Sequence, residues 1–300
     1  MIYTVTLNPA LDYVVQIDDF SSGKLNRNRT EHLYFGGKGV NVSCILKELG
    51  FESTALGFIA GFTGTALNQG LQSLGIHTDF IEVAEGMTRI NVKIKSEDET
   101  EINGTGPLIR EEDFLTLLEK LRNLGKEDCL IISGSIPSCM ESDTYKRILS
   151  AVSDDVRIIA DAERKLLTGI LRYRPFLIKP NLHELEEIFD VTIRTDEEIA
   201  SYACKLQEAG AVNVLVSMAA QGALLLDEHG TVHRRGCASG TVVNSVGAGD
   251  SMVAGFLAGY LRSNDYDEAL KLGTACGGAT AFHSGLAKRA EIEEILSTLE

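Results

Sequence analysis

The 300-residue sequence lacks the long apolar segments that membrane and exported proteins need. Its longest apolar stretches, such as Met252–Leu261, are too short and too rich in glycine to span a bilayer. The first twenty residues also lack a basic start followed by an apolar run, which argues against a signal peptide. We therefore expect a cytoplasmic protein that does not act on a membrane.

Closely spaced cysteine pairs are missing as well. The sequence contains six cysteines, but no two of them form a CxxC pair. Without such pairs, a disulfide framework or a structural zinc site is not expected, and a reducing compartment is the default. The six lie far apart, at Cys44, Cys129, Cys139, Cys204, Cys237 and Cys276.

Positive charge is in short supply. The chain has 28 lysine and arginine residues against 43 aspartate and glutamate residues, so its formal net charge is −15. Such an acidic chain is unsuited to nucleic acid or an anionic membrane as its main partner. A phosphorylated small molecule is still compatible with this charge, because a few local Lys and Arg side chains outweigh a diffuse acidic surface.

Short apolar segments alternate with amphipathic segments along most of the chain. Strands that read as continuous apolar runs, separated by helices, indicate a parallel sheet covered on both faces. The expected strands are Ile2–Leu7, Thr54–Phe58, Cys129–Ser133, Val156–Ala160, Phe176–Lys179 and Val212–Ser217. The expected helices are Val40–Leu49, Gly64–Leu74, Arg110–Leu124, Asp143–Ala151, Leu166–Leu171, Leu182–Phe189, Asp196–Glu208, Ser251–Leu261, Tyr266–Ser284 and Ala290–Leu299.

Two stretches depart from this alternation. Leu11–Phe35 and Thr88–Asn103 have the alternating pattern of strands with charged residues, and neither is followed promptly by a helix. We expect them to form a small antiparallel sheet that projects from the core as a lid or a dimer surface. Residues 1–300 would then be one domain, with a lid sheet built from about 11–35 and 88–106.

The segment Asn244-Ser-Val-Gly-Ala-Gly-Asp250, followed by an apolar helix, is the strongest chemical signal. Glycines at 247 and 249 let backbone N–H groups converge on one point, and the following helix adds the positive end of its dipole there. Asp250 lies at the mouth of this anion site, placed to take a proton from an attacking hydroxyl. The alternative is an aspartate that only caps the helix after a glycine-rich turn. The motif alone does not decide between them.

A second glycine-rich segment, Gly36-Gly-Lys-Gly-Val-Asn41, leads into an expected helix. Its glycines permit close approach to a ligand, and Lys38 and Asn41 supply polar contacts. The spacing matches neither the P-loop nor the dinucleotide fingerprint. This mismatch counts against a nicotinamide oxidoreductase, which a glycine-rich loop in an α/β chain otherwise suggests. Taken alone, such a segment is more often a plain turn than a binding site.

The third segment, Lys179-Pro-Asn-Leu-His-Glu184, follows an expected strand. Asn181 and Glu184 share one helical face and are suited to hold water around a Mg²⁺ that bridges nucleotide phosphates. Asn followed three residues later by Glu is also a capping box, and one pair of residues can do both. The turn at Ser217–Gly222 also has two interpretations: it contacts a nucleotide phosphate, or it is an ordinary turn.

Together these segments resemble the signatures of the PfkB (ribokinase-like) carbohydrate kinases, over nearly the whole chain. Gly36–Ser43 resembles the family's N-terminal signature, Asn244–Phe256 its C-terminal signature and Asn181–Glu184 its NxxE metal motif. The resemblance implies a ribokinase-like three-layer α/β/α core with a mainly parallel sheet and a small projecting β-sheet lid. It also implies an enzyme that uses ATP and Mg²⁺.

Finer features resemble one branch of this family. Thr4–Asp12 and Ser133–Pro137 are similar to the phosphohexose kinases, and Thr88–Lys93 and Glu101–Pro107 are most similar to those that act on fructose 1-phosphate. The resemblance implies phosphoryl transfer from ATP to the 6-hydroxyl of this sugar, giving fructose 1,6-bisphosphate. The nearest alternative substrate is tagatose 6-phosphate. A more distant alternative is a non-catalytic sugar-phosphate sensor on the same fold.

The resemblance also implies roles for individual residues. Asp250 would be the base, and the backbone of Gly247, Ala248 and Gly249 the anion hole. The substrate-binding residues would be Asp12, Gly37 and Asn41 for sugar hydroxyls, and Lys38, Arg89 and Lys24 for the substrate's own phosphate. The residues for ATP and Mg²⁺ would be Lys179, Asn181, Glu184, Ser217, Gly222, Ser245 and Gly278, with Asn181 and Glu184 reaching the metal through water.

Two positions depart from the family pattern. The family's nucleotide loop usually has a glycine two residues after its serine, where this chain has Ala219, and alanine tolerates a positive φ less well. After the strand Val156–Ala160 the family commonly shows Asp-Thr/Ser-x-Gly, where this chain has Asp161-Ala-Glu-Arg. The resemblance therefore implies no ligand contact for the loop that follows this strand. Neither departure touches Asp250 or the glycine turn.

Overall fold

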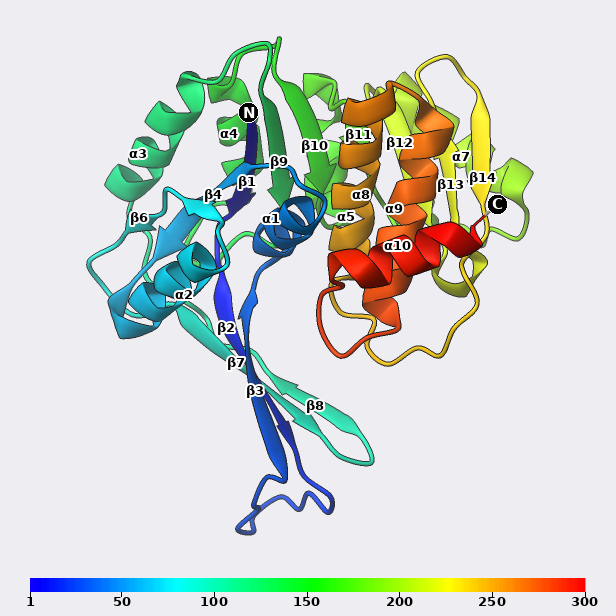
Figure 1. Cartoon of the computed structure of the whole chain (residues 1–300). Coiled ribbons are helices and arrows are strands. Elements are labelled where there is room, and N and C mark those ends of the chain that lie inside the picture. The colour runs from blue at the N-terminus through cyan, green and yellow to red at the C-terminus, as the bar shows by residue number, and fades with distance from the viewer. Residues whose placement is uncertain (300) are drawn as a thin grey trace.

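The computed structural model describes residues 1–299, apart from the side chain of Arg164. A ten-stranded sheet forms its centre, and a four-stranded sheet extends away from it (Figure 1). The large sheet contains β1 (Ile2–Thr6), β4 (Ser53–Ile59), β5 (His77–Thr78), β6 (Ile81–Glu82), β9 (Cys129–Ser133), β10 (Arg157–Asp161), β11 (Leu177–Ile178), β12 (Asn213–Ser217), β13 (Ala223–Leu226) and β14 (Val232–Arg235). Its strand order is β14-β13-β12-β11-β10-β9-β1-β4-β5, with β6 paired to β4.

Helices cover both faces of this sheet. One face carries α3 (Glu111–Arg122), α4 (Thr144–Ala151), α5 (Arg164–Ile170), α6 (Leu182–Phe189) and α7 (Asp196–Glu208). The other carries α1 (Lys38–Glu48), α8 (Ala248–Ser263), α9 (Tyr266–Ala281) and α10 (Arg289–Thr298), while α2 (Gly61–Ser73) packs beside α1. In β9, Leu130 and Ile132 join one core and Ile131 the other, because successive side chains of a strand point to opposite faces. The expected three-layer core is confirmed.

The carboxyl ends of the central strands lie along one edge of the sheet. Strands β4, β1, β9, β10, β11 and β12 all pair in parallel, whereas β13 pairs antiparallel with β12 and β14 antiparallel with β13. The residues that end these strands, including Thr6, Ser133, Asp161 and Ser217, are therefore neighbours at that edge. In open α/β sheets this is the edge where ligands bind.

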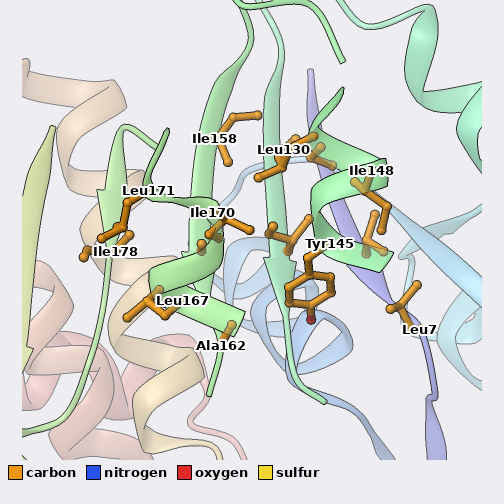
Figure 2. Close-up of a cluster of buried hydrophobic side chains, with 14 of the residues drawn as sticks. Leu7, Leu130, Tyr145, Ile148, Ile158, Ala162, Leu167, Ile170, Leu171 and Ile178 are labelled. Carbon is orange, nitrogen blue, oxygen red and sulfur yellow. The ribbon is translucent and has the colours of Figure 1, made fainter. Parts of the chain in front are cut away.

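One buried cluster connects the core to this edge (Figure 2). Tyr145 of α4 is 1% exposed and packs among aliphatic side chains that include Leu130, Ile148 and Leu167. Its hydroxyl donates a hydrogen bond of 2.8 Å to the carbonyl oxygen of Gly134. A buried hydroxyl needs such a partner, so the bond fixes the loop that follows β9.

The small sheet, which we call the lid, consists of β2 (Ala10–Gln16), β3 (Thr30–Gly36), β7 (Arg89–Lys95) and β8 (Glu99–Ile102), in the order β3-β2-β7-β8. The expectation of an antiparallel sheet is wrong for the central pair, since β2 and β7 are parallel. Both strands leave the core in the same direction, because the chain returns to the core through α1, β4 and α2 before β7 begins. The hairpin partners β3 and β8 are antiparallel to them.

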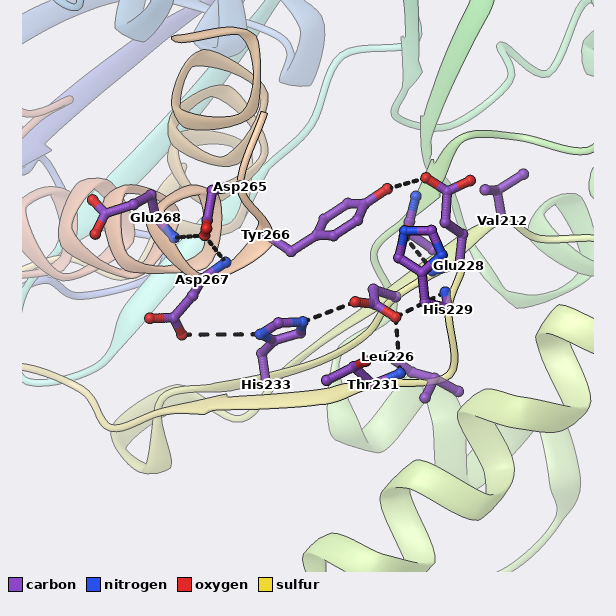
Figure 3. A network of polar contacts seen from close by, with 12 residues as sticks. Val212, Leu226, Glu228, His229, Thr231, His233, Asp265, Tyr266, Asp267 and Glu268 are labelled. Atoms are coloured by element: carbon purple, nitrogen blue, oxygen red, sulfur yellow. Dashed lines mark hydrogen bonds and ion pairs between the residues drawn. The ribbon is translucent and has the colours of Figure 1, made fainter. Parts of the chain in front are cut away.

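The hairpin β13–β14 was not expected from the sequence, and a polar network ties it to α9 (Figure 3). Buried Asp227 accepts N–H groups from His229 and Thr231 and lies 3.0 Å from Nε2 of His233. Tyr266 of α9 donates to Glu228 at 2.6 Å. Because β13 follows directly after Ser217–Gly222, the network also steadies that turn.

No helix within residues 1–299 is long and apolar enough to cross a membrane. The six cysteines are free thiols.

The backbone of Ala219 has a φ of +47°, in the left-handed region that glycine adopts at lower cost. Replacing it with glycine, the residue typical of the family at this position, should raise the free energy of unfolding by about 1 kcal/mol. Urea unfolding of Ala219→Gly against wild type measures this. As a control, Ala200→Gly inside α7 should lower the free energy of unfolding by about 1 kcal/mol. A loss of the same size in both variants would contradict the strain at Ala219.

Candidate active site

A cavity of about 290 Å³, which we call the cleft, opens at the carboxyl edge between the lid and the start of α8. Its size is close to the lower end of the roughly 300–1,000 Å³ typical of ligand pockets. Seven residues expected from the sequence line it: Asp12, Gly37, Lys38, Asn41, Arg89, Gly247 and Asp250. The other lining residues are Thr6, Leu7, Asn8, Asn91, Ser133, Gly134, Ser135, Glu163 and Val246. A larger cavity of about 540 Å³ adjoins it and shares Asp12, Asn41 and Val246.

The glycine turn before α8 has the geometry of an anion site. Gly247 is the N-cap of α8, with a φ of +81°, and Ala248 begins the helix. By helix geometry the N–H groups of Gly249 and Asp250 have no carbonyl partner inside α8. Asp250 therefore lies in the first helical turn and is not the capping residue. The capping alternative for this aspartate is wrong.

The carboxylate of Asp250 is buried at the cleft, with 5% of the residue exposed. Asn41 donates a hydrogen bond of 2.8 Å from Nδ2 to its Oδ2. Burial, and after it the negative charge of Asp161, raise the pKa of Asp250 to about 7, against the opposing effects of Asn41, Lys38 and Lys179. A carboxylate with a pKa near neutrality is well matched to a general base.

The glycines of the second motif pack against β1. A Cβ at Gly37, whose φ is +118°, would lie 2.6 Å from Thr6 Cγ2, and a Cβ at Gly39 would lie 2.6 Å from Thr6 Oγ1. The N–H group of Val40 donates to that same hydroxyl at 3.1 Å. Close packing on the end of β1 therefore requires these two glycines. It also fixes the start of α1, so that Lys38 and Asn41 face the cleft.

Asp12 of β2 is held in place by its neighbours on the lid. Its Oδ1 accepts a hydrogen bond of 2.7 Å from Asn91 Nδ2, and Asn91 Oδ1 accepts the N–H group of Gly104 at 3.2 Å. Its carboxylate also lies so close to Gly36 that a Cβ there would collide with it. Sequence reasoning missed Asn91, although the parallel pairing of β2 with β7 sets it directly beside Asp12.

Arg89 and Lys24 lie in different places. Arg89 lines the cleft and donates from Nε to the carbonyl oxygen of Asn8 at 3.1 Å. Burial lowers the pKa of Arg89, while nearby Asp12 acts in the opposite direction. Lys24 is exposed in the loop between β2 and β3, at the far end of the lid, and lines neither cavity (Figure 1). Its contact with the substrate phosphate stays a prediction.

Lys38 and Lys179 meet at a third residue, Asp161. Lys38 Nζ lies 3.6 Å from Asp161 Oδ2, and Lys179 Nζ lies 3.5 Å from Asp161 Oδ1. Burial lowers the pKa of Lys38, but the carboxylates of Asp161, Asp250 and Glu184 outweigh it, and the net shift is upward. Sequence reasoning gave Asp161 no role. Its place at the carboxyl end of a buried parallel strand was the available signal.

Asn181 and Glu184 form the capping box of α6. The Asn181 N–H donates to Glu184 Oε2 and the Glu184 N–H donates to Asn181 Oδ1, each at 2.8 Å. The capping interpretation is therefore right. A carboxylate has a second oxygen, and Glu184 is near enough to Lys38 to raise its pKa, so the pair also fits a water-bound metal at this edge. The metal role itself stays a prediction.

The remaining residues expected for the nucleotide lie on neighbouring segments. Ser217 donates its N–H to the Pro180 carbonyl at 3.1 Å and forms a β-bridge with Asn181. Gly222 has a φ of +88°, and a Cβ there would collide with the backbone of β14. Ser245 is exposed in the turn before α8, and Gly278 is buried in α9.

Comparisons with known proteins identify the family of the chain. Residues 5–293 match the family model described as pfkB family carbohydrate kinase. The chain is 46% identical to 1-phosphofructokinase of Bacillus subtilis, over 99% of this chain and 97% of that protein. It is 38% identical to D-tagatose-1-phosphate kinase of Bacillus licheniformis, over 100% and 99%. The crystal structure of phosphofructokinase-2 from Escherichia coli in complex with substrates and products matches with a TM-score of 0.92 and 26% identity, over 99% of each chain. The chain belongs to the pfkB family of carbohydrate kinases.

Proposed function

We propose that the protein transfers the γ-phosphoryl group of ATP to the 6-hydroxyl of fructose 1-phosphate, giving fructose 1,6-bisphosphate and ADP. The observation that carries this proposal is the buried carboxylate of Asp250, facing a sugar-sized cleft where a glycine turn meets the start of α8. The 46% identity to a 1-phosphofructokinase supports this choice of substrate. Residues 1–300 act as one kinase domain in this proposal.

The cleft provides contacts along the length of a sugar phosphate. Asp12, Gly37 and Asn41 bind sugar hydroxyls, with Asp12 held by Asn91. Arg89, at the lid side of the cleft, binds the substrate's own phosphate, because no carboxylate forms an ion pair with it among residues 1–299. Buried Asn8 Oδ1 and Ser133 Oγ also lack hydrogen-bond partners within the described chain, and a polar ligand would supply them.

The contacts of Lys38 favour a different role from the one expected. Its neighbours Asp161, Asp250 and Glu184 all lie on the side of the base and the nucleotide. A lysine in that position is better placed to neutralise the transferring phosphoryl group than to bind the remote substrate phosphate. We assign Lys38 to the transferred group, beside Lys179 and the amides of Gly247, Ala248 and Gly249.

The transfer depends on positioning and charge neutralisation, as phosphoryl transfer generally does. Asp250 takes the proton of the 6-hydroxyl while the turn amides and the lysines receive the phosphoryl oxygens. Ser217, Gly222, Ser245 and Gly278 flank the nucleotide. Mg²⁺ would bridge its phosphates, held through water by Asn181 and Glu184. The lid covers the sugar and keeps out water that would otherwise hydrolyse ATP.

Removing the charge of Asp250 tests the base. In Asp250→Asn, kcat should fall about 10³-fold, because the amide cannot take the hydroxyl proton. KM for the sugar should change little, since the side chain keeps its size and its contact with Asn41. A coupled ADP assay measures both constants, with Asp154→Asn at an exposed position between α4 and β10 as the control. Turnover close to wild type in Asp250→Asn would refute the assignment.

The position of the substrate phosphate is the main open alternative. Fructose 1-phosphate and tagatose 1-phosphate differ only in configuration at C4 and present the same 6-hydroxyl, whereas tagatose 6-phosphate carries its phosphate at the other end. The names of the relatives at 46% and 38% identity both specify or imply a sugar 1-phosphate. They therefore support a substrate whose phosphate is on C1.

Offering the three sugar phosphates to the purified enzyme separates these alternatives. We expect kcat/KM to be lowest for tagatose 6-phosphate, because Arg89 is fixed at one distance from Asp250. Of the two 1-phosphates, fructose 1-phosphate should be preferred to tagatose 1-phosphate, since the relative named 1-phosphofructokinase is the more similar in sequence. The same ADP assay gives all three values, and fructose 6-phosphate serves as the mismatched control. A preference for tagatose 6-phosphate would replace the proposed substrate and leave the mechanism intact.

The outer face of the lid supports a homodimer. Leu33, Tyr13, Val92 and Ile102 are direct neighbours across its four strands, so their side chains share a face, and they lie in the row next to Asp12 and Asn91. Leu33 is 53% exposed and Ile102 59%, and Leu33 also borders the larger cavity. An apolar row left open to water at both ends favours pairing with a second copy of the same sheet.

Charging this row tests the dimer. Leu33→Glu with Ile102→Glu should convert the dimer to monomer, because pairing would bury two carboxylates on each lid. Sedimentation velocity measures the mass of each species. Val232→Glu, at a similarly exposed position on β14, should leave the mass of the wild type unchanged. A wild type that is monomeric, or a double variant that stays dimeric, would refute pairing through the lid.

A further inference from the structure

Asp161, at the carboxyl end of β10, connects two segments that are far apart in the sequence. Each of its oxygens has a different lysine within 3.6 Å: Lys38 at Oδ2 and Lys179 at Oδ1. Asp161 is 3% exposed and Lys179 is 5% exposed, so this part of the contact is out of water. A charge in such a place is stable only with a partner of opposite sign.

The two lysines come to the turn before α8 from different segments of the chain. Lys38 opens α1, in the segment that also supplies Asn41 to Asp250. Lys179 follows β11 and comes close to the turn itself, since a Cβ at Gly249 would lie 3.2 Å from its Nζ. Asp161 is therefore the common anchor of two cations that come from distant segments of the chain.

We infer that Asp161 is a positioning residue for phosphoryl transfer, holding Lys38 and Lys179 on either side of the transferring group. The inference rests on the proposed kinase function and adds to it a residue to which sequence reasoning gave no role. Without this carboxylate, two ammonium groups near one point would repel each other. The lysines would then turn away from the phosphoryl path or lose part of their charge.

Asp161 also acts on the base. The charged and hydrogen-bonding groups that face Asp250 are Asn41, Lys38, Lys179 and Asp161, and only Asp161 is negative. Its charge helps to raise the pKa of Asp250 to about 7, second to burial. Because the base must be unprotonated, turnover of the wild type should fall as pH drops through this value. Neutralising Asp161 should shift that acid limb to lower pH.

Asp161→Asn tests the inference, because the amide keeps the size of the side chain and removes its charge. We expect kcat to fall about 10²-fold, the effect of misplacing groups by about 1 Å, with KM for the sugar within a few-fold of wild type. The acid limb of the kcat–pH profile should move to lower pH. In Asp161→Glu, which restores the charge, the limb should return toward its wild-type position.

A matched control distinguishes the effect of the position of Asp161 from the effect of removing any buried carboxylate. Asp227→Asn removes another carboxylate that is 3% exposed and lies 3.0 Å from a ring nitrogen of His233, far along the sheet at the β13–β14 hairpin. It should leave the acid limb unchanged. An acid limb that is the same in Asp161→Asn and wild type would overturn the inference. A higher Mg²⁺ requirement, with kcat recovered at high Mg²⁺, would also overturn it and make Asp161 a metal ligand.

A readout independent of turnover distinguishes failure of this inference from failure of the proposed function. In ¹³C NMR titration of labelled lysines, with the Lys38 signal assigned from Lys38→Arg, the pKa of Lys38 should fall in Asp161→Asn. An unchanged Lys38 titration overturns the role of Asp161. If the wild type phosphorylates no sugar phosphate, the proposed function fails, while a lowered Lys38 pKa still supports Asp161 as its anchor.

Discussion

The site depends on a balance of four charges at the carboxyl edge of the sheet. Asp161 and Asp250 are buried carboxylates, and Lys38 and Lys179 are the cations that face them. Neither carboxylate would tolerate burial without the lysines, and the lysines would repel each other without a carboxylate between them. The balance leaves Asp250 with a pKa near 7 instead of fully charged or fully neutral. In the proposed mechanism, the base and the lysines beside it therefore share one electrostatic environment.

The fold explains why these groups meet. Asp161, Lys179 and Ser217 each follow one of three adjacent parallel strands, so their side chains emerge at the same edge. The facing groups come from helix starts: α1 supplies Lys38, and α8 supplies Asp250 and free N–H groups. The ends of the buried strands hold their residues in fixed positions. The helix N-termini add partial positive charge from N–H groups that have no partner inside the helix. The combination suits a ligand that is itself highly charged.

Much of this could be predicted from the sequence, because the signals were local. Alternating apolar runs predicted the layered core, and the glycine turn predicted the surroundings of Asp250. The sequence places Asp161 at the end of a strand but does not reveal its partners, because Lys38 and Lys179 are distant in the chain and no spacing rule joins them. The parallel pairing of β2 with β7 was missed for a similar reason, since it depends on the path of the chain between them. Ion pairs between distant residues and the order of strands in a sheet depend on the three-dimensional fold, so local sequence patterns do not predict them.

The register of the lid connects the proposed sugar site to the face proposed for pairing. One row across its strands, with Asp12 beside Asn91, faces the cleft, and the next row, with Tyr13 beside Val92, faces away. If β2 and β7 paired one residue out of register, Asp12, the proposed sugar-binding residue, would point away from the cleft. The apolar row would then point into it. The hydrogen bond from Asn91 to Asp12 and the tight fit of Asp12 against Gly36 oppose such a slip. In a lid that pairs with a second copy, dimer contacts on the outer row would then stabilise the same register that presents Asp12 to the sugar.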